Sequence, residues 1–132
     1  QTLTAIAGSS GWFDRGFVTY SNAAKMDMLG VPETTLERHG AVSEATARAM
    51  AQGVLSHSRA DWSLSITGIA GPSGGTAEKP VGTVCFAWAS NDSGCEAKTR
   101  LFSGDRAAVR EQSVRYALRG LLERLGASSM SA

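Results

Sequence analysis

The stretch Trp62-Ser63-Leu64-Ser65-Ile66-Thr67-Gly68-Ile69-Ala70-Gly71-Pro72-Ser73-Gly74-Gly75 indicates the kind of fold this chain adopts. Apolar and polar residues alternate over the first five positions, which is the period of a half-buried β-strand. The glycines and the proline that follow are typical of a loop. In α/β sheets a loop after a strand is a common ligand site, because small residues let backbone amides approach an anion closely. The stretch therefore predicts a strand followed by a ligand loop.

Downstream of this loop the sequence predicts a hairpin and a helix. Residues 81–89 and 97–102 are rich in β-formers, and the turn residues 91–94 between them predict an antiparallel pair. From residue 105 to about 125, apolar residues recur at helical spacing with arginines between them, which predicts an amphipathic helix. Residues 127–132 are small and polar, so we expect a flexible tail.

Upstream of the loop the sequence predicts helices and one more strand. Residues 43–57 have one apolar face and begin with Ser43, and residues 32–36 suit a shorter helix. Residues 15–21 alternate and are rich in β-formers, which predicts a strand that runs directly into a helix from Asn22.

In that short helix, Asn22 is the expected N-cap and Gly30 the expected terminator after Met28. The order of elements over residues 1–126 favours a single α/β domain, a layered α/β/α arrangement with a mixed sheet.

Composition excludes several classes of protein. The 132 residues fit one domain, and a formal charge of +1 provides no strong field for nucleic acid or a membrane surface. No apolar run approaches the roughly 20 residues of a membrane span. Cys85 and Cys95 are too few for a disulfide framework, which favours reduced thiols and a cytoplasmic location. His39 and His57 have no metal-ligand spacing, so we expect no metal.

Four stretches carry a resemblance to a known family. The chain is similar to the C-terminal domain of the competence-damage-inducible (CinA) proteins, and the motifs keep the family's order along nearly the whole chain. The resemblance implies hydrolysis of the carboxamide of nicotinamide mononucleotide by a serine and a lysine, with no cofactor, in a homo-oligomer, with a dimer favoured. The stretches are Ala7-Gly8-Ser9-Ser10-Gly11-Trp12-Phe13, Val18-Thr19-Tyr20-Ser21-Asn22-Ala23-Ala24-Lys25, His39-Gly40-Ala41-Val42-Ser43, and Thr67-Gly68-Ile69-Ala70-Gly71-Pro72 with Glu78-Lys79-Pro80-Val81-Gly82-Thr83-Val84.

The resemblance assigns three residues to catalysis. Lys25 matches the family's catalytic lysine and is the expected general base, which requires burial or a nearby cation to lower its pKa. Tyr20 is expected to orient the lysine or the substrate amide, the alternative being a packed strand tyrosine. Ser10 bridges the lysine and the nucleophile, is itself the nucleophile, or stabilises a turn.

The resemblance also assigns residues to substrate binding. Arg106 suits the phosphate, because a guanidinium fork and a helix N-terminus both attract anions. The alternative for Arg106 is a surface ion pair with Asp105. Lys79 in the neighbouring motif is read as a solvated loop lysine. The other expected substrate contacts are Asn22, Thr67, Gly68, Ala70 and Gly71.

The N-terminal end of the sequence leaves two functional hypotheses. Residues 1–7 resemble the end of a helix, and the family carries a helix, a strand and a Glu-Ser-Cys-Thr-Gly-Gly segment before the point that matches Gln1. The serine of that segment is the preferred nucleophile, so this chain alone is expected to lack it. The alternative is a binding or assembly domain without catalysis. A dinucleotide-binding oxidoreductase is excluded, because no Gly-x-Gly-x-x-Gly follows the first strand.

Overall fold

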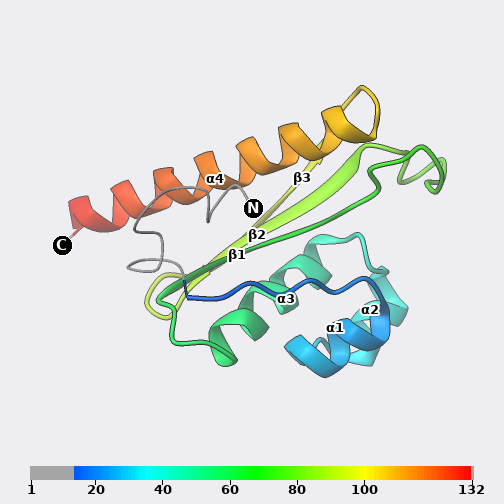
Figure 1. Cartoon of the computed structure of the whole chain (residues 1–132). Helices are drawn as coiled ribbons and strands as arrows, with labels where there is room; N and C mark the ends of the chain where they lie inside the picture. The colour runs from blue at the N-terminus through cyan, green and yellow to red at the C-terminus, as the bar shows by residue number, and fades with distance from the viewer. Residues whose placement is uncertain (1–13, 132) are drawn as a thin grey trace.

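The computed structural model describes the backbone of residues 14–131 and the side chains of residues 14–126. Within that range the elements are arranged as a sheet between helices (Figure 1). The elements are α1 (Asn22–Leu29), α2 (Glu33–His39), α3 (Glu44–Ser56), β1 (Trp62–Gly68), β2 (Thr83–Ser90), β3 (Gly94–Leu101) and α4 (Arg106–Ser131).

The described sheet has the order β1-β2-β3, and both of its strand pairs are antiparallel. The predicted antiparallel hairpin is therefore confirmed, with Ser90 opposite Gly94 at its turn. The predicted mixed sheet does not occur within residues 14–131, because no helix crosses over between consecutive strands there to bring a pair into the parallel sense.

The helices cover both faces of this sheet. Figure 1 shows α4 above it and α3 below it, with α1 and α2 packed beneath α3. The predicted α/β/α layering is confirmed. No helix among residues 14–131 is long and apolar enough to cross a bilayer.

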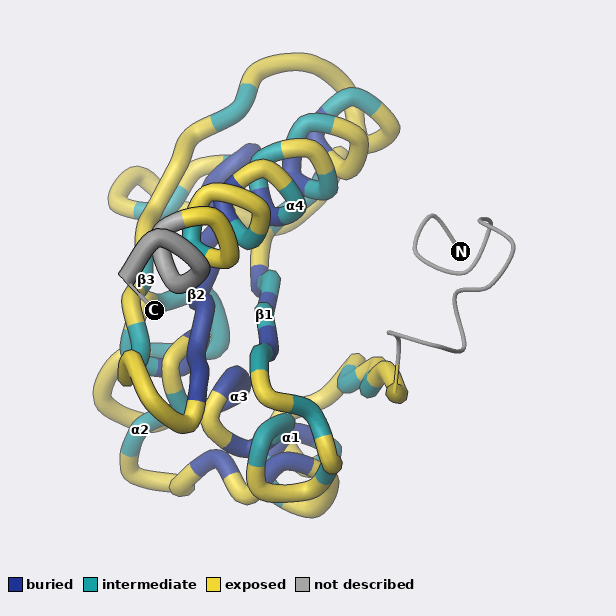
Figure 2. Tube along the Cα trace, turned by 90° about the vertical axis from the view of Figure 1, so that its left-hand side faces the viewer, coloured by how far each residue is buried: buried dark blue, intermediate teal, exposed yellow. Residues whose placement is uncertain are grey.

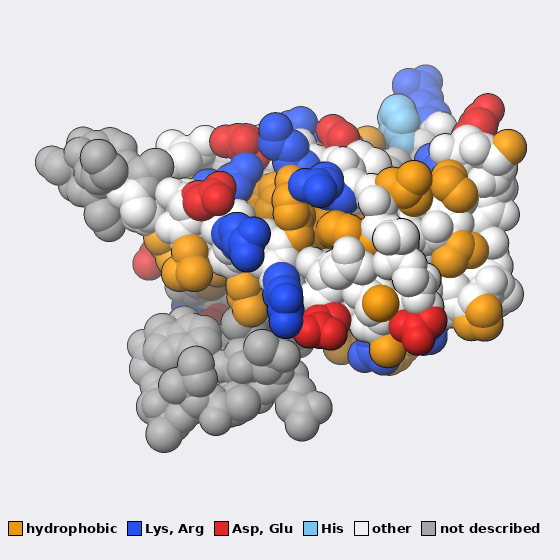
Figure 3. Space-filling view, turned by 90° about the horizontal axis from the view of Figure 1, so that it is seen from above, with side chains coloured by type: hydrophobic (Ala, Val, Ile, Leu, Met, Phe, Trp, Pro, Cys, Tyr) orange, Lys and Arg blue, Asp and Glu red, His pale blue; other side chains and the backbone are white. Residues whose placement is uncertain are grey.

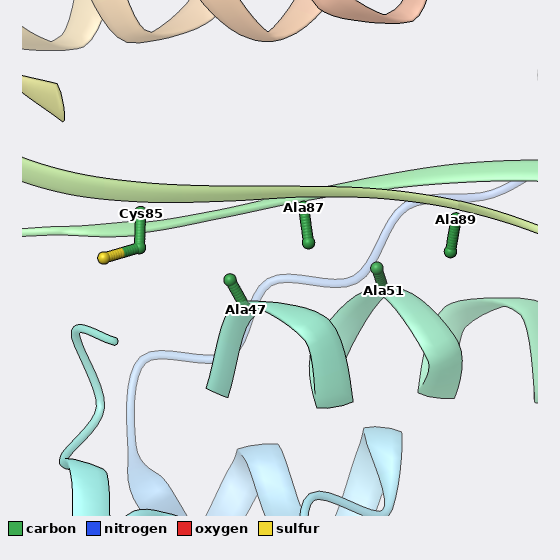
Figure 4. Close-up of a cluster of buried hydrophobic side chains, with 5 residues drawn as sticks. All are labelled: Ala47, Ala51, Cys85, Ala87 and Ala89. Atoms are coloured by element: carbon green, nitrogen blue, oxygen red, sulfur yellow. The ribbon is translucent and has the colours of Figure 1, made fainter. Parts of the chain in front are cut away.

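Small side chains bring α3 close to the sheet. Ala47 and Ala51 of α3 face Cys85, Ala87 and Ala89 of β2, and all five are buried (Figure 4). Alanine methyl groups keep the two backbones near each other, so a larger residue at this contact would force the helix off the sheet.

Hydroxyl groups of β1 fix the position of α3 along the sheet. Three buried side chains on alternate positions point to the same face and donate to backbone carbonyls of α3 and of the turn before it. The bonds are Ser63 to Ala51, Ser65 to Ala47 and Thr67 to Ala41, at 2.7, 2.6 and 2.8 Å.

Large aromatic side chains occupy the opposite face, under α4. Phe86 and Trp88 of β2 are stacked with ring centroids 6.0 Å apart, and Tyr116 of α4 lies 4.6 Å from Phe86. The Trp88 indole N–H donates to the Ala117 carbonyl at 2.9 Å. Gly120 lies directly over this indole, so that a Cβ there would overlap the ring. Close packing of α4 on the sheet depends on that glycine.

The segment before α1 differs from the prediction. Residues 14–20 form no strand. They nevertheless run extended along the molecule (Figure 1). From Gly16 onward, exposed and half-buried residues alternate along this segment (Figure 2). A strand requires a hydrogen-bonded neighbour, and no described strand pairs with this segment.

The helix ends test the predicted caps. Ser21, not Asn22, is the N-cap of α1, and its hydroxyl accepts from the Ala24 N–H at 3.0 Å. Gly30 and Ser43 cap as predicted. The helix α4 continues through Ser131, beyond the expected end near residue 125, and whether its last residues move in solution stays a prediction.

Two glycines of α4 provide a test of the close contact with Trp88. We expect Gly120→Ala to destabilise the protein by about 1–3 kcal/mol, because the added methyl overpacks the indole. The control is Gly126→Ala in the same helix, where a Cβ meets nothing within 4 Å. It should stabilise by up to about 1 kcal/mol through helix propensity. Equal effects in urea unfolding would contradict the packing account.

Candidate active site

Lys25 lies in the middle of α1, a helix whose two ends are fixed by specific caps. The Ser21 hydroxyl fixes its first turn, and Gly30 in the left-handed conformation (φ 68°) ends it with an N–H bonded to the Lys25 and Met26 carbonyls. The extended segment before α1 contacts the Lys25 side chain. The Lys25 Nζ donates to the carbonyl of Thr19, at the end of this segment, at 3.1 Å.

The environment of Lys25 favours the neutral amine. The residue is only 7% exposed, and among the described residues no carboxylate lies within ion-pair distance of it. Burial lowers the pKa of Lys25, because the ammonium form loses hydration. Lysines are seldom buried without an acidic partner, so a buried lysine with a lowered pKa is a candidate for chemistry.

The other residues predicted at this end of the site lie differently. The Tyr20 side chain is 95% exposed, and no hydrogen bond joins it to Lys25 in this structure. Asn22 is exposed in the first turn of α1. Ser10 lies outside the described residues. The catalytic roles of Tyr20 and Ser10 therefore stay predictions.

The predicted ligand loop is divided between the two faces of the sheet. Thr67 points toward α3, where its hydroxyl bonds to the Ala41 carbonyl, whereas Gly68 lies on the α4 side. Adjacent strand residues face opposite sides of the sheet. A ligand on the α4 side that touches Gly68 therefore cannot reach the Thr67 hydroxyl. Gly68 has no room for a Cβ, which would lie 2.9 Å from the Val84 side chain.

Arg106 is joined to this loop directly. At the start of α4, the Arg106 Nη1 donates to the Gly71 carbonyl at 3.0 Å. Asp105 instead caps α4, with its carboxylate accepting from the Ala108 N–H at 2.9 Å. The structure has no Asp105–Arg106 ion pair among its described residues. Arg106 therefore supports the loop through one nitrogen, and phosphate binding would use its remaining donors.

A cavity of about 220 Å³ lies beside the loop, between β1, β2 and α4. Small-molecule pockets usually measure about 300–1,000 Å³, so this one suits part of a ligand. Its polar lining is limited, because the Ser113 hydroxyl is already bonded to the Val109 carbonyl at 2.7 Å. The lining residues are Ile66, Gly68, Ala70, Val84, Val109, Arg110, Ser113 and Val114.

The face around α4 is rich in arginine. Figure 3 shows basic side chains gathered over the middle of this face, around exposed hydrophobic groups. Of the α4 arginines, Arg115 pairs with Glu111 and Arg124 with Glu96, at 2.8 and 2.9 Å. An anion that approaches this face would meet the others, which are Arg106, Arg110 and Arg119.

Comparison with known proteins identifies the family. Residues 1–125 match the CinA C-terminal domain. The chain belongs to this family. It is 57% identical over 121 residues to the nicotinamide-nucleotide amidohydrolase PncC of Escherichia coli K12, a match that covers 92% of this chain and 73% of that protein. PncC of Enterobacter agglomerans is also 57% identical, over 122 residues, 92% of this chain and 74% of its own.

Solved structures agree with the fold of this CinA domain. The competence/damage inducible protein CihA of Agrobacterium tumefaciens has a TM-score of 0.88 at 50% identity, over 92% of this chain and 74% of that one. The ComA protein of Klebsiella pneumoniae has a TM-score of 0.89 at 42% identity, over 94% and 76%.

The structure thus brings together some of the predicted residues. Gly68 and Ala70 line the cavity of this CinA domain, and Arg106 is bonded to Gly71 of the adjoining loop. Lys25 is instead bonded to Thr19 at the end of the extended segment. The sequence reasoning missed Arg110 at the cavity, although its place one helical turn after Arg106 was a usable signal.

The titration of Lys25 tests whether its burial has the expected effect. The chain has three lysines, Lys25, Lys79 and Lys98, so each Cε signal can be followed by NMR in protein labelled with ¹³C-lysine. We expect Lys25 to titrate at lower pH than exposed Lys98, because burial disfavours its charge. Titration of the two at the same pH would remove the argument for a neutral base.

Proposed function

We propose that this CinA domain is an enzyme that hydrolyses the carboxamide of nicotinamide mononucleotide to nicotinic acid mononucleotide and ammonia. The names of the PncC relatives, at 57% identity over 92% of the chain, support this substrate and reaction. The structural observation that carries the proposal is Lys25, which is buried, lacks an acidic partner among the described residues and has a lowered pKa.

A neutral Lys25 is suited to activate a serine. An amide is a poor electrophile, so the hydroxyl has to lose its proton as it attacks the carbonyl carbon. The lysine accepts that proton and afterwards gives one to the departing ammonia, and water hydrolyses the acyl-enzyme by the same route. Lysine serves as this base only while neutral, which is the form that burial favours.

The serine nucleophile is proposed to lie outside residues 14–131. The Lys25 amine donates to the Thr19 carbonyl, and no serine hydroxyl of the described residues is bonded to it. The preferred nucleophile is the serine of an upstream Glu-Ser-Cys-Thr-Gly-Gly segment, with Ser10 as the alternative. Room for added chain is available, since β1 has a strand partner on one side only within the described sheet.

The basic face at α4 is the proposed seat of the substrate phosphate. The Arg106 guanidinium is held at the helix start by the Gly71 carbonyl, which leaves further N–H groups for an oxyanion. A cytoplasmic homodimer without cofactor stays the expectation for the whole protein.

Ammonia release from nicotinamide mononucleotide tests the function. We expect turnover from a chain extended upstream through the Glu-Ser-Cys-Thr-Gly-Gly segment and none from the 132-residue chain. In the active chain, Lys25→Ala should lower kcat at least about 100-fold, because general-base catalysis contributes that much. The matched control is Lys98→Ala, which removes an exposed lysine and should leave kcat unchanged.

Other outcomes would decide among the alternatives. Turnover by the 132-residue chain that Ser10→Ala abolishes would make Ser10 the nucleophile. Absence of turnover in both chains, with binding retained, would favour a domain that binds without catalysis. Activity of Lys25→Ala within tenfold of the parent would exclude Lys25 as the base.

Calorimetric binding tests the phosphate contact separately from turnover. We expect Arg106→Ala to weaken nicotinamide mononucleotide at least tenfold more than the phosphate-free riboside, because charge-assisted bonds to the phosphate are lost. The control is Arg115→Ala, which removes an exposed α4 arginine already paired with Glu111 and should change neither affinity much. Equal losses for both ligands would restrict Arg106 to its observed support of Gly71.

A further inference from the structure

The extended segment over Lys25 is attached to the rest of the domain at three places. At its start, Asp14 and Arg15 contact the end of α3. In its middle, Phe17 packs against the apolar cluster between α1, α2 and α3. At its end, the Thr19 carbonyl accepts from Lys25. The first attachment has no part in the mechanism described above.

We propose that Asp14 and Arg15 form a positioning staple, which seats the extended segment on α3 and so keeps the Thr19 carbonyl over the Lys25 amine. This inference rests on the proposed role of Lys25 as general base. Neither Asp14 nor Arg15 contacts the lysine amine or any reacting atom, so both act through the segment.

The geometry of the staple is specific. The Asp14 carboxylate accepts from the Arg59 N–H at 3.0 Å and from the Arg15 Nε at 3.1 Å through the same oxygen. The Arg15 Nη1 donates to the His57 carbonyl at 3.1 Å. The bonds to Arg59 and His57 join residues more than 40 positions apart in sequence, so they tie the segment to the end of a distant helix.

The end of α3 is a suitable anchor. His57 is its C-cap, and the last carbonyls of a helix lack intrahelical partners and carry partial negative charge. A guanidinium is always charged and presents its donors in a fixed fork, which matches a carbonyl and a carboxylate together. The Arg59 N–H lowers the pKa of Asp14, and the two Arg15 effects act in the same direction, so the carboxylate is ionised at neutral pH.

The staple matters for Lys25 because burial alone is the cause of its lowered pKa. No titratable group on the surrounding elements contributes to the lowered pKa of Lys25. These groups are Asp14, Arg15 and Tyr20 on the segment, Asp27 on α1, and Glu44, Arg48 and His57 on or after α3. A loosened segment would let water reach the amine and raise its pKa.

The test measures the Lys25 pKa by ¹³Cε NMR in the 132-residue chain, with Lys98 as internal reference. In the parent protein, the difference between the pKa values of Lys98 and Lys25 is measured first. In Asp14→Asn and in Arg15→Lys, we expect the Lys25 pKa to rise by at least half of that difference. Loss of the Asp14 charge alone would lower the pKa of a lysine, so a rise reports loss of burial. The control is Asp61→Asn, which removes an exposed carboxylate near Arg59 and should leave Lys25 unchanged.

Two results would overturn the staple. One is a Lys25 pKa that is unchanged or lower in both variants, and the other is an equal rise in Asp61→Asn. Asp14 and Arg15 are exposed, so neither substitution opens the core, and amide spectra verify the fold of each variant. If Asp14→Asn unfolds, the Lys25 pKa in Arg15→Lys, which keeps the net charge, decides whether the staple exists. If Lys25 shifts as expected while Lys25→Ala retains full ammonia release, the staple stands and the proposed role of Lys25 as general base fails.

Discussion

The close contact between α3 and the sheet is the constraint on which the rest of this structure depends. Alanines at positions 47 and 51 meet the small residues of β2, and the hydroxyls of Ser63, Ser65 and Thr67 bond to carbonyls of α3 and the turn before it. Buried polar groups are costly unless bonded, so this pattern permits one register of helix on sheet. The helices α1 and α2 and the extended segment then pack on α3, which places Lys25.

The two faces of the sheet therefore carry separate groups of the predicted site residues. The small-residue face fixes α3 and, through it, the buried lysine. The aromatic face seats α4, and the cavity between β1, β2 and α4 lies on the same face, next to the loop whose Gly71 carbonyl accepts from Arg106. Thr67 and Gly68 are adjacent in the chain yet belong to opposite faces, which shows how a single loop motif contributes to two layers.

Local signals in the sequence predicted most of the described fold. Caps such as Ser43 and Gly30, the alternation from Trp62 and the turn before Gly94 all depend on neighbouring residues, and each was found from them. The failures concern non-local pairing. Residues 15–21 have strand composition but no described partner, and the parallel pair of a mixed sheet depends on contacts that periodicity does not encode. The proposed role of Lys25 required burial or a nearby cation, and the sequence did not decide between them. The burial of Lys25 and its bond to Thr19 depend on how the chain outside α1 packs, which the sequence pattern does not show.

The manner in which the pKa of Lys25 is lowered has a consequence for the proposed enzyme. A neighbouring cation would lower the pKa of a lysine whether or not the extended segment covered it. Here no cation contributes, and burial is the cause. The lowered pKa of the amine then depends on the cover that the extended segment provides. Packing of that segment, its attachment to the end of α3 and the basicity of the amine are consequently one property of the fold. In the proposed enzyme, contacts distant from Lys25 would therefore affect the basicity of its amine.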